Sequence, residues 1–331
     1  DVIDSSNWQK LEGLVPDSVL NWVKKGDYIL EIGELAYDLA ANHPDYILEA
    51  MQTNVGKYEL DEDEGIVDLK TGKMPKYIIG YPFPEIDPND PGAAAKIMHN
   101  NQYAQFFPGD VRLFHDIEWV GRGGFEREIS GVGTQGAMTG WPGAQDRTNP
   151  DRKQKYFTTL ITHPYDVQGT AIMTWRYLAG GKPDDSFGYV PAIRRVRRMS
   201  PANRSDSFVG SDLTMDDSNG YDGKVAAFRW KLQGQQEAIV PYYDQNLVTV
   251  VQNRKGEWHT TRDTKETIYG YGKDGWQGAP WAPTNDIWVK RPVYILEIES
   301  KDKYYNYGTC YLWVDRETYF CNYKVIYDRS G

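Results

Sequence analysis

Four arginines stand together near the middle of the chain, and such clusters often bind nucleic acid or other anions. They are Arg194, Arg195, Arg197 and Arg198. Six aspartates flank them, at positions 184, 185, 206, 212, 216 and 217. Because side chains alternate along a strand, the arginines would fall on both faces, and nearby carboxylates are natural bidentate partners. We therefore expect a strand that is tied to the following loop by Arg–Asp pairs, with Asp212 and Asp216 among the partners. An anion-binding or partner-docking patch is the alternative.

Other residues that carry catalysis or bind cofactors are scattered in the sequence. The five histidines form no HExxH pair, and no GxSxG element occurs. Residues 216–222 are acidic but lack the ligand spacing of a calcium loop. Residues 270–275 match GxGxxG, yet the proline-rich stretch that follows cannot begin the helix that a dinucleotide site requires. We expect no enzymatic activity, no cofactor and no metal.

Two cysteines, Cys310 and Cys321, lie in one expected hairpin near the end of the chain. A four-residue loop at 315–318 places them diagonally on the same face, which is too far apart for an unstrained bond. A one-residue bulge would bring them opposite each other. In an exported chain a disulfide is the favoured interpretation, and two free, half-buried thiols are the alternative.

The elements that must position these residues are mainly strands. The expected helices lie at 16–25, 44–55 and 93–106, all in the first third. Runs rich in Val, Ile, Thr, Tyr and Trp follow, at 111–120, 156–162, 169–178, 189–199, 225–232, 287–299 and 304–327. Turn signals separate them, so the sheet should be antiparallel. We expect a mixed helical and irregular part at 1–110 and an antiparallel β domain at 111–331, packed as one structural unit.

Alternation along these strands indicates which side chains line a cavity. In residues 169–178, Met173, Trp175 and Tyr177 share one face. In the closing hairpin both faces are partly apolar, which indicates a sheet that is covered on both sides or that lines a cavity. The candidate liners are Met173, Trp175, Tyr177, Trp230, Tyr311 and Trp313.

Charge and composition narrow the choice of partners. The 331 residues have a formal net charge of −10, which argues against nucleic acid as a partner. No apolar run is long enough to span a membrane as a helix. The chain begins at Asp1, and we expect a mature form from which a secretory signal was removed, although an arbitrary boundary would look the same.

The arginine segment and its surroundings also resemble a known family. The pattern consists of Tyr189 and Pro191 before residues 194–198, then Phe208, Gly210, Ser211 and Asp212, and the closing hairpin at 311–328. It resembles the LolA/LolB-like family of outer-membrane lipoprotein-sorting proteins, in a larger branch of unassigned function. The resemblance covers about residues 184–327. It implies a strongly curved, open antiparallel sheet, a half-barrel, with a few helices on its concave side and an apolar cavity for acyl chains.

These observations lead to one expected function and two alternatives. We expect a periplasmic, non-enzymatic carrier for a lipid, a lipoprotein acyl chain or another hydrophobic molecule in a Gram-negative bacterium. The resemblance further implies an inner-membrane resistance-nodulation-type exporter and an outer-membrane protein as partners. One alternative is a glycan-binding or glycan-cleaving β protein that uses Trp276, Trp281 and Trp288 as an aromatic platform. The other is a structural subunit of an envelope assembly.

Overall fold

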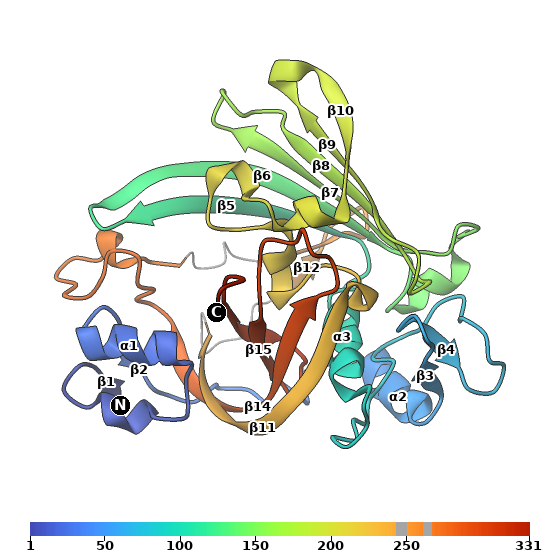
Figure 1. Cartoon of the computed structure of the whole chain (residues 1–331), viewed down its shortest axis with the longest axis horizontal. Helices are drawn as coiled ribbons and strands as arrows, with labels where there is room; N and C mark the ends of the chain where they lie inside the picture. The colour runs from blue at the N-terminus through green and yellow to red at the C-terminus, as the bar shows by residue number, and fades with distance from the viewer. Residues whose placement is uncertain (243–249, 261–266) are drawn as a thin grey trace. The chain divides into compact units, whose positions relative to one another are not determined.

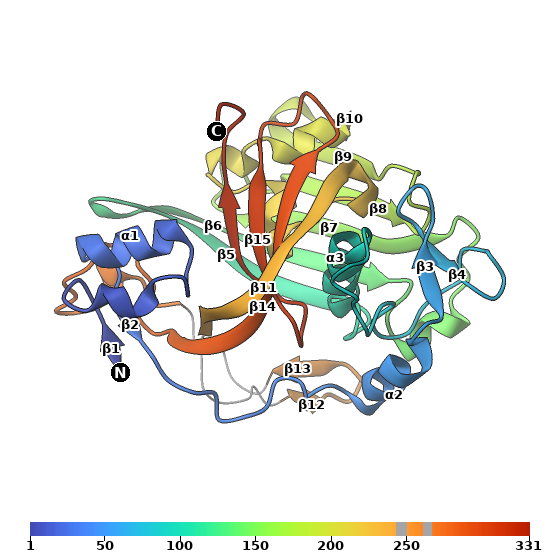
Figure 2. The ribbon, with the colours of Figure 1, turned by 60° about the horizontal axis from the view of Figure 1, so that its bottom comes forward.

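The computed structural model describes residues 1–242, 250–260 and 267–331 (Figures 1 and 2). The chain forms two compact units, and neither is one continuous stretch. The first unit contains Asp1–Asn42, Glu118–Arg127 and Gln236–Val293, and the second contains His43–Ile117, Glu128–Gln235 and Tyr294–Gly331. Residues 1–110, expected as one N-terminal part, therefore divide between the two units after Asn42.

The first unit is built around a short amphipathic helix, α1 (Asp17–Lys25). Gly26 ends this helix with a left-handed φ of 80°, a conformation that glycine adopts without strain. Two short antiparallel pairs belong to the same unit: β1 (Val2–Ile3) with β2 (Leu30–Glu31), and β12 (Val250–Gln252) with β13 (Trp258–Thr260). Tyr271 donates a hydrogen bond of 2.8 Å to Glu118, which ties two distant segments of this unit together.

Most of a six-stranded sheet lies in the second unit, and its segment Glu118–Arg127 belongs to the first. Each strand of this sheet pairs with the strand next to it in sequence. Its strands are β5 (Val111–Gly121), β6 (Gly124–Ala137), β7 (Lys153–His163), β8 (Ala171–Tyr177), β9 (Asp185–Val190) and β10 (Arg195–Met199). The recorded pairings from β6 to β10 are antiparallel, as the turn signals between the strands predict. β10 is an edge strand, so it has a partner on one side in this sheet.

A four-stranded sheet carries the end of the chain, in the order β11-β14-β15-β16. Its strands are β11 (Phe228–Tyr242), β14 (Ile287–Ser300), β15 (Cys310–Asp315) and β16 (Cys321–Ile326). The predicted fold class is confirmed, because the structure is mainly β, with open, curved antiparallel sheets and few helices. The strands divide between two larger sheets, however, whereas the resemblance implied one.

Helix α3 (Ala93–Ala104) is the central element of the second unit, and all of its residues except Ala104 are buried. Its Ile97 and Met98 share a core with Leu312 and Val314 of the four-stranded sheet. Its Tyr103 packs in a second core, which includes Ala137 at the end of β6. The helix thus contributes side chains to the cores of both sheets.

Several buried polar residues of α3 hydrogen-bond to backbone groups of the surrounding loops. Asn100 accepts from the Phe83 N–H and donates to its carbonyl, and Gln102 donates to the Gly223 carbonyl at 2.7 Å. Buried amides are stable when they are paired in this way. Two smaller elements precede α3 in the same unit: α2 (Asp45–Asn54) and the hairpin of β3 (Tyr58–Leu60) and β4 (Ile66–Asp68).

Candidate functional site

Strand β8 buries Thr174 and Arg176 more deeply than Met173 and Trp175. Thr174 and Arg176 are 2% and 1% exposed, whereas Met173 and Trp175 are half-buried. The Trp175 ring lies 5.6 Å from the ring of Phe187, on the face opposite Arg176. Side chains alternate between the two faces of this strand, as predicted. The more deeply buried face, however, carries Thr174 and Arg176, whereas we expected Met173 and Trp175 to line a cavity.

Arg176 belongs to a group of six buried charged side chains, which we call the ionic cluster. Its members are Lys155, Arg176, Arg204, Asp184, Asp216 and Asp222. No side chain of the cluster is more than 8% exposed. Because each cation contacts at least one carboxylate, the charges compensate one another within the protein interior.

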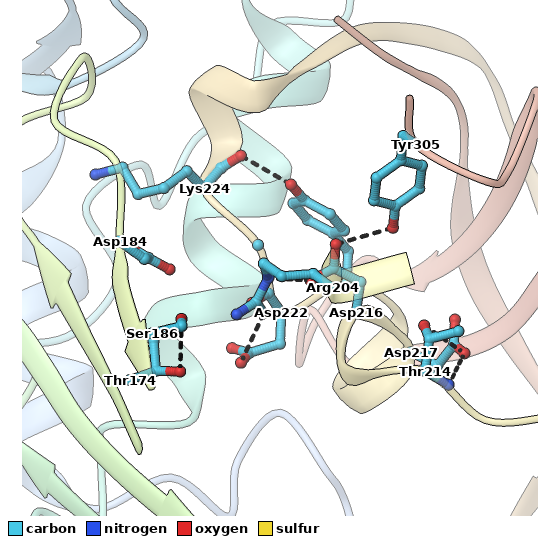
Figure 3. A network of polar contacts seen from close by, with 12 residues as sticks. Thr174, Asp184, Ser186, Arg204, Thr214, Asp216, Asp217, Asp222, Lys224 and Tyr305 are labelled. Atoms are coloured by element: carbon cyan, nitrogen blue, oxygen red, sulfur yellow. Dashed lines mark hydrogen bonds and ion pairs between the residues drawn. The ribbon is translucent and has the colours of Figure 1, made fainter. Parts of the chain in front are cut away.

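Asp222 is the centre of the ionic cluster, because all three cations contact it, and Figure 3 shows it beside Arg204 and Asp216. Lys155 Nζ lies 2.5 Å and Arg176 Nη1 lies 3.1 Å from Asp222 Oδ1. Arg204 donates through Nη2 to the Asp222 carbonyl and through Nε to Asp216 Oδ1, the latter at 2.6 Å. Burial alone would raise the pKa of Asp222, but Lys155, Arg176 and Arg204 together hold it well below its usual range.

The arginines of the RRVRR segment lie outside the ionic cluster. Arg195, Arg197 and Arg198 are exposed on β10, and Arg194 is exposed in the turn before it, with a left-handed φ of 47°. Arg198 pairs with Asp185. In the described part of the chain, none of these four arginines bonds to Asp212 or Asp216.

The predicted Arg–Asp network therefore exists with different arginines. Asp216 is a member, but its partner is Arg204, and the exposed Asp212 takes no part in the cluster. The physical reason is that β10 is an edge strand whose side chains reach solvent. Arg176 projects from an interior strand, and Arg204 is a buried side chain of the 3-10 turn Pro201–Ser205.

A cavity of about 270 Å³ adjoins the ionic cluster within the second unit. Its apolar lining includes Pro183, Met199, Pro201, Tyr221 and Phe228. Its polar lining includes Asp184, Arg204, Asp216, Lys224 and Tyr305. The cavity therefore combines an apolar wall with a charged wall, an arrangement that suits an amphipathic small molecule.

Lys224 and Tyr305 complete the charged wall. The Lys224 ammonium donates to the carbonyls of Tyr177 and Ala179 at 2.7 and 2.6 Å, and burial lowers its pKa to about 8. The Tyr305 hydroxyl donates to Asp216 Oδ2 at 2.8 Å, and burial together with Asp216 raises the pKa of this phenol. Both groups therefore contribute hydrogen bonds to the charged wall.

The six residues predicted to line a cavity do not line this one. Met173 and Trp175 lie on the opposite face of the sheet, and Tyr177 is buried with its hydroxyl on Asp185 at 2.7 Å. Trp230 packs against the core and donates to the Val225 carbonyl at 2.7 Å. The remaining two are half-buried: Tyr311 borders an open groove, and Trp313 packs edge-on against Tyr323.

The two cysteines are free, buried thiols, which corrects the favoured disulfide. Cys310 is opposite Ile326 in the β15–β16 pairing, and Cys321 is opposite Val314. A register shift between Trp313 and Val314 does occur, but it leaves the cysteines near opposite ends of the hairpin. Burial raises the pKa of Cys310 to about 11 and that of Cys321 to about 12, so both are thiols at neutral pH.

The remaining sequence motifs form no second site in the described residues. The GxGxxG segment is a short 3-10 turn, Gly270–Gly272, with no α-helix after it. Trp288 is 3% exposed and Trp276 and Trp281 are half-buried, so the three do not present an open aromatic platform. Within residues 1–242, 250–260 and 267–331, no group of three or more His, Cys, Asp or Glu could hold a metal, and no helix could cross a membrane.

Comparison with known proteins gives three similar structures. An outer membrane lipoprotein-sorting protein domain from Vibrio parahaemolyticus is 17% identical, with a TM-score of 0.42 over 71% of this chain and 72% of the other. A DUF1329 family protein from Desulfovibrio piger ATCC 29098 is 21% identical, with a TM-score of 0.44 over 74% of this chain and 75% of the other. The LolA superfamily protein NE2245 from Nitrosomonas europaea is 12% identical, with a TM-score of 0.36 over 72% of this chain and 73% of the other.

Sequence comparison assigns the whole chain to one family. None of the curated proteins matches it. The family model that is described as a protein of unknown function, DUF1329, matches residues 2–331. The chain belongs to the DUF1329 family.

Proposed function

We propose that this protein binds a hydrophobic or amphipathic small molecule in the cavity of its second unit and acts as a carrier for it. The observation that supports the proposal is a cavity of about 270 Å³ that is partly lined by Met199, Pro201 and Phe228. A cavity of ~150 Å³ with apolar walls is large enough to bind benzene. The cavity can therefore hold a ring or a short stretch of an acyl chain.

The expected affinity is moderate, as a carrier requires. Burial of apolar surface contributes about 0.8 kcal/mol for each methylene group. A segment of about eight methylenes would thus gain roughly 6 kcal/mol before the loss of translational and conformational freedom is subtracted. Such a ligand would bind and still dissociate without a chemical step.

Binding, rather than catalysis, is supported by the way the ionised groups are used. Arg204 and Tyr305 both bond to Asp216, and Arg176 bonds to Asp184 and Asp222. These side chains hold one another in fixed positions, and burial lowers the pKa of Lys155 to about 8 without freeing it from Asp222. The cluster is suited to shaping a polar end of the cavity.

We also propose that the carrier works in the periplasm, between an inner-membrane exporter of the resistance-nodulation type and an outer-membrane protein. The support is the motif resemblance in the arginine segment, in residues 208–212 and in the closing hairpin. Fractionation of cells that produce the native precursor tests the location, and crosslinking in cells tests the partners. Recovery of the protein in the cytoplasm would contradict this placement.

The binding function is tested with purified protein by native mass spectrometry and by extraction into organic solvent. We expect an adduct or an extractable small molecule, and we expect Met199→Trp, which fills the cavity, to abolish binding. Met173→Trp is the matched control, because Met173 is also half-buried but lies on the opposite face of the same sheet. Equal binding by the wild-type protein and both variants would show that the cavity is not the site.

A further inference from the structure

The charged wall of the cavity contains a hydrogen-bond acceptor that has no donor. The side chain of Asp184 is 6% exposed, and its Oδ2 accepts from Arg176 Nε and Nη2 at 3.0 and 2.8 Å. Its Oδ1 is buried and has no hydrogen-bond partner in the described part of the chain. A buried carboxylate oxygen without a donor is unfavourable, so this position calls for a donor from outside the protein chain.

Donors that are only partly used lie on the same wall. An ammonium group has three N–H bonds, and Lys224 uses two of them on backbone carbonyls. The recorded hydrogen bonds of Arg204 use Nε and Nη2 and leave Nη1. Asp184, Lys224 and Arg204 all line the cavity, and Figure 3 shows them together. A head group placed here meets a free acceptor as well as free donors.

The charge around the cavity disfavours an anionic head group. Asp184 and Asp216 are paired with arginines inside the ionic cluster. The other charged groups of the lining are the carboxylates of Glu62, Asp63 and Asp302 and the ammonium groups of Lys224 and Lys301. Together they leave an excess of one negative charge. A carboxylate or phosphate ligand would therefore face both this excess and the lone oxygen of Asp184.

We propose that the ligand has a head group that donates a hydrogen bond and is not anionic, an alcohol or an amine, and that this donor bonds to Asp184 Oδ1. Its apolar part lies along Met199 and Phe228, on the apolar wall of the cavity. This inference rests on the proposed function, because it assigns a chemical class to the ligand of the same cavity. The shared chemistry of the two head groups is the N–H or O–H donor.

Four probes with chains of similar length test the head group by calorimetric titration of the full-length wild-type protein at pH 7. They are octan-1-ol, octylamine, octanoate and methyl heptyl ether, an isomer of octanol that accepts but does not donate. We expect octanol, octylamine or both to bind at least about tenfold more tightly than the ether and octanoate, since a hydrogen bond to a charged group has roughly that effect. Preference for one donor supports the proposal and names the head group. Binding of the ether or octanoate as tight as that of the better donor would overturn it.

A variant tests the role of Asp184 directly. In Asp184→Asn the amide oxygen can still accept from Arg176, and the amide N–H₂ takes the place of Oδ1. The advantage of the better donor probe over the ether should therefore fall at least about tenfold. Asp185→Asn is the matched control, because Asp185 instead accepts from Tyr177 and Arg198. An unchanged preference in a folded Asp184→Asn protein would contradict the assignment, and the probe series with wild-type protein decides the matter if that variant does not fold.

The two proposals fail in different ways. If none of the four probes binds and Met199→Trp has no effect on extracted ligand, the proposed function is wrong. If all four probes bind with equal affinity and Met199→Trp abolishes binding, the cavity is the site but the inference about the head group is wrong.

Discussion

Replacement of Arg176 by methionine should destabilise the protein strongly, because it removes a cation from the centre of the ionic cluster. The guanidinium is 1% exposed and contacts Asp184 at 2.8 Å and Asp222 at 3.1 Å. Asp222 still contacts Lys155 and Arg204, but Asp184 loses the two hydrogen bonds that Arg176 Nε and Nη2 donate to its carboxylate. Removal of one partner from a buried ion pair typically costs about 3–5 kcal/mol, and we expect a loss in that range.

The measurement is the free energy of unfolding from urea denaturation, followed by far-UV circular dichroism. Arg195→Met is the matched control, since the same change on the exposed edge strand should alter stability by less than about 0.5 kcal/mol. The double variant Arg176→Met/Asp184→Leu removes the orphaned carboxylate as well and should recover much of the loss. Two results would refute the reasoning: a loss below about 1 kcal/mol for Arg176→Met, or an equal loss for Arg195→Met.

Three further predictions concern pH and redox state. Burial lowers the pKa of His99 to about 4, below the ~6.5 of an unfolded chain. The free energy of unfolding should therefore fall by about 3 kcal/mol as the pH drops from 6.5 to 4. His99→Gln should flatten this part of the curve of stability against pH. Burial raises the pKa of Asp286 to about 6, so its charge destabilises the fold as the pH rises from about 4 to 6. Asp286→Asn should therefore stabilise the protein at pH 7 by about 1 kcal/mol, after allowance for partial exposure, and equal or lower stability would contradict this. Because Cys310 and Cys321 are free, a reducing agent should leave the melting temperature unchanged, and alkylation of both thiols should require unfolding; a shift on reduction would indicate a disulfide.

The strand content of the fold could be predicted from sequence because it depends on local patterns. Runs of β-branched and aromatic residues, bounded by Gly, Pro, Asn and Asp, mark β7, β8 and β14. The division into two sheets could not be predicted, because it depends on which strands pair over long distances. β11 ends at Tyr242 and β14 begins at Ile287, so the pairing of these two strands leaves no local signal in the sequence.

The buried face of β8 could not be predicted from hydropathy. Alternation placed Met173 with Trp175 and Thr174 with Arg176, which the structure has as well. Hydropathy then favoured the face with the large apolar residues, but the buried face carries Arg176. A buried arginine is stable only when carboxylates from elsewhere meet it, and Asp222 comes from a turn 46 residues later. One signal was available: Asp184, eight residues after Arg176, was already among the aspartates that we expected to pair with arginine.

The ionic cluster also explains why the side chains around the cavity of about 270 Å³ do not collapse into it. An apolar cavity tends to shrink, because neighbouring side chains gain contacts when they move into it. On the charged wall this movement would break the bonds of Arg204 with Asp216 and of Tyr305 with the same carboxylate. The loss of one such buried, charged hydrogen bond is comparable to the gain from burying a few methylene groups. The wall is therefore held in place by its own ion pairs and hydrogen bonds.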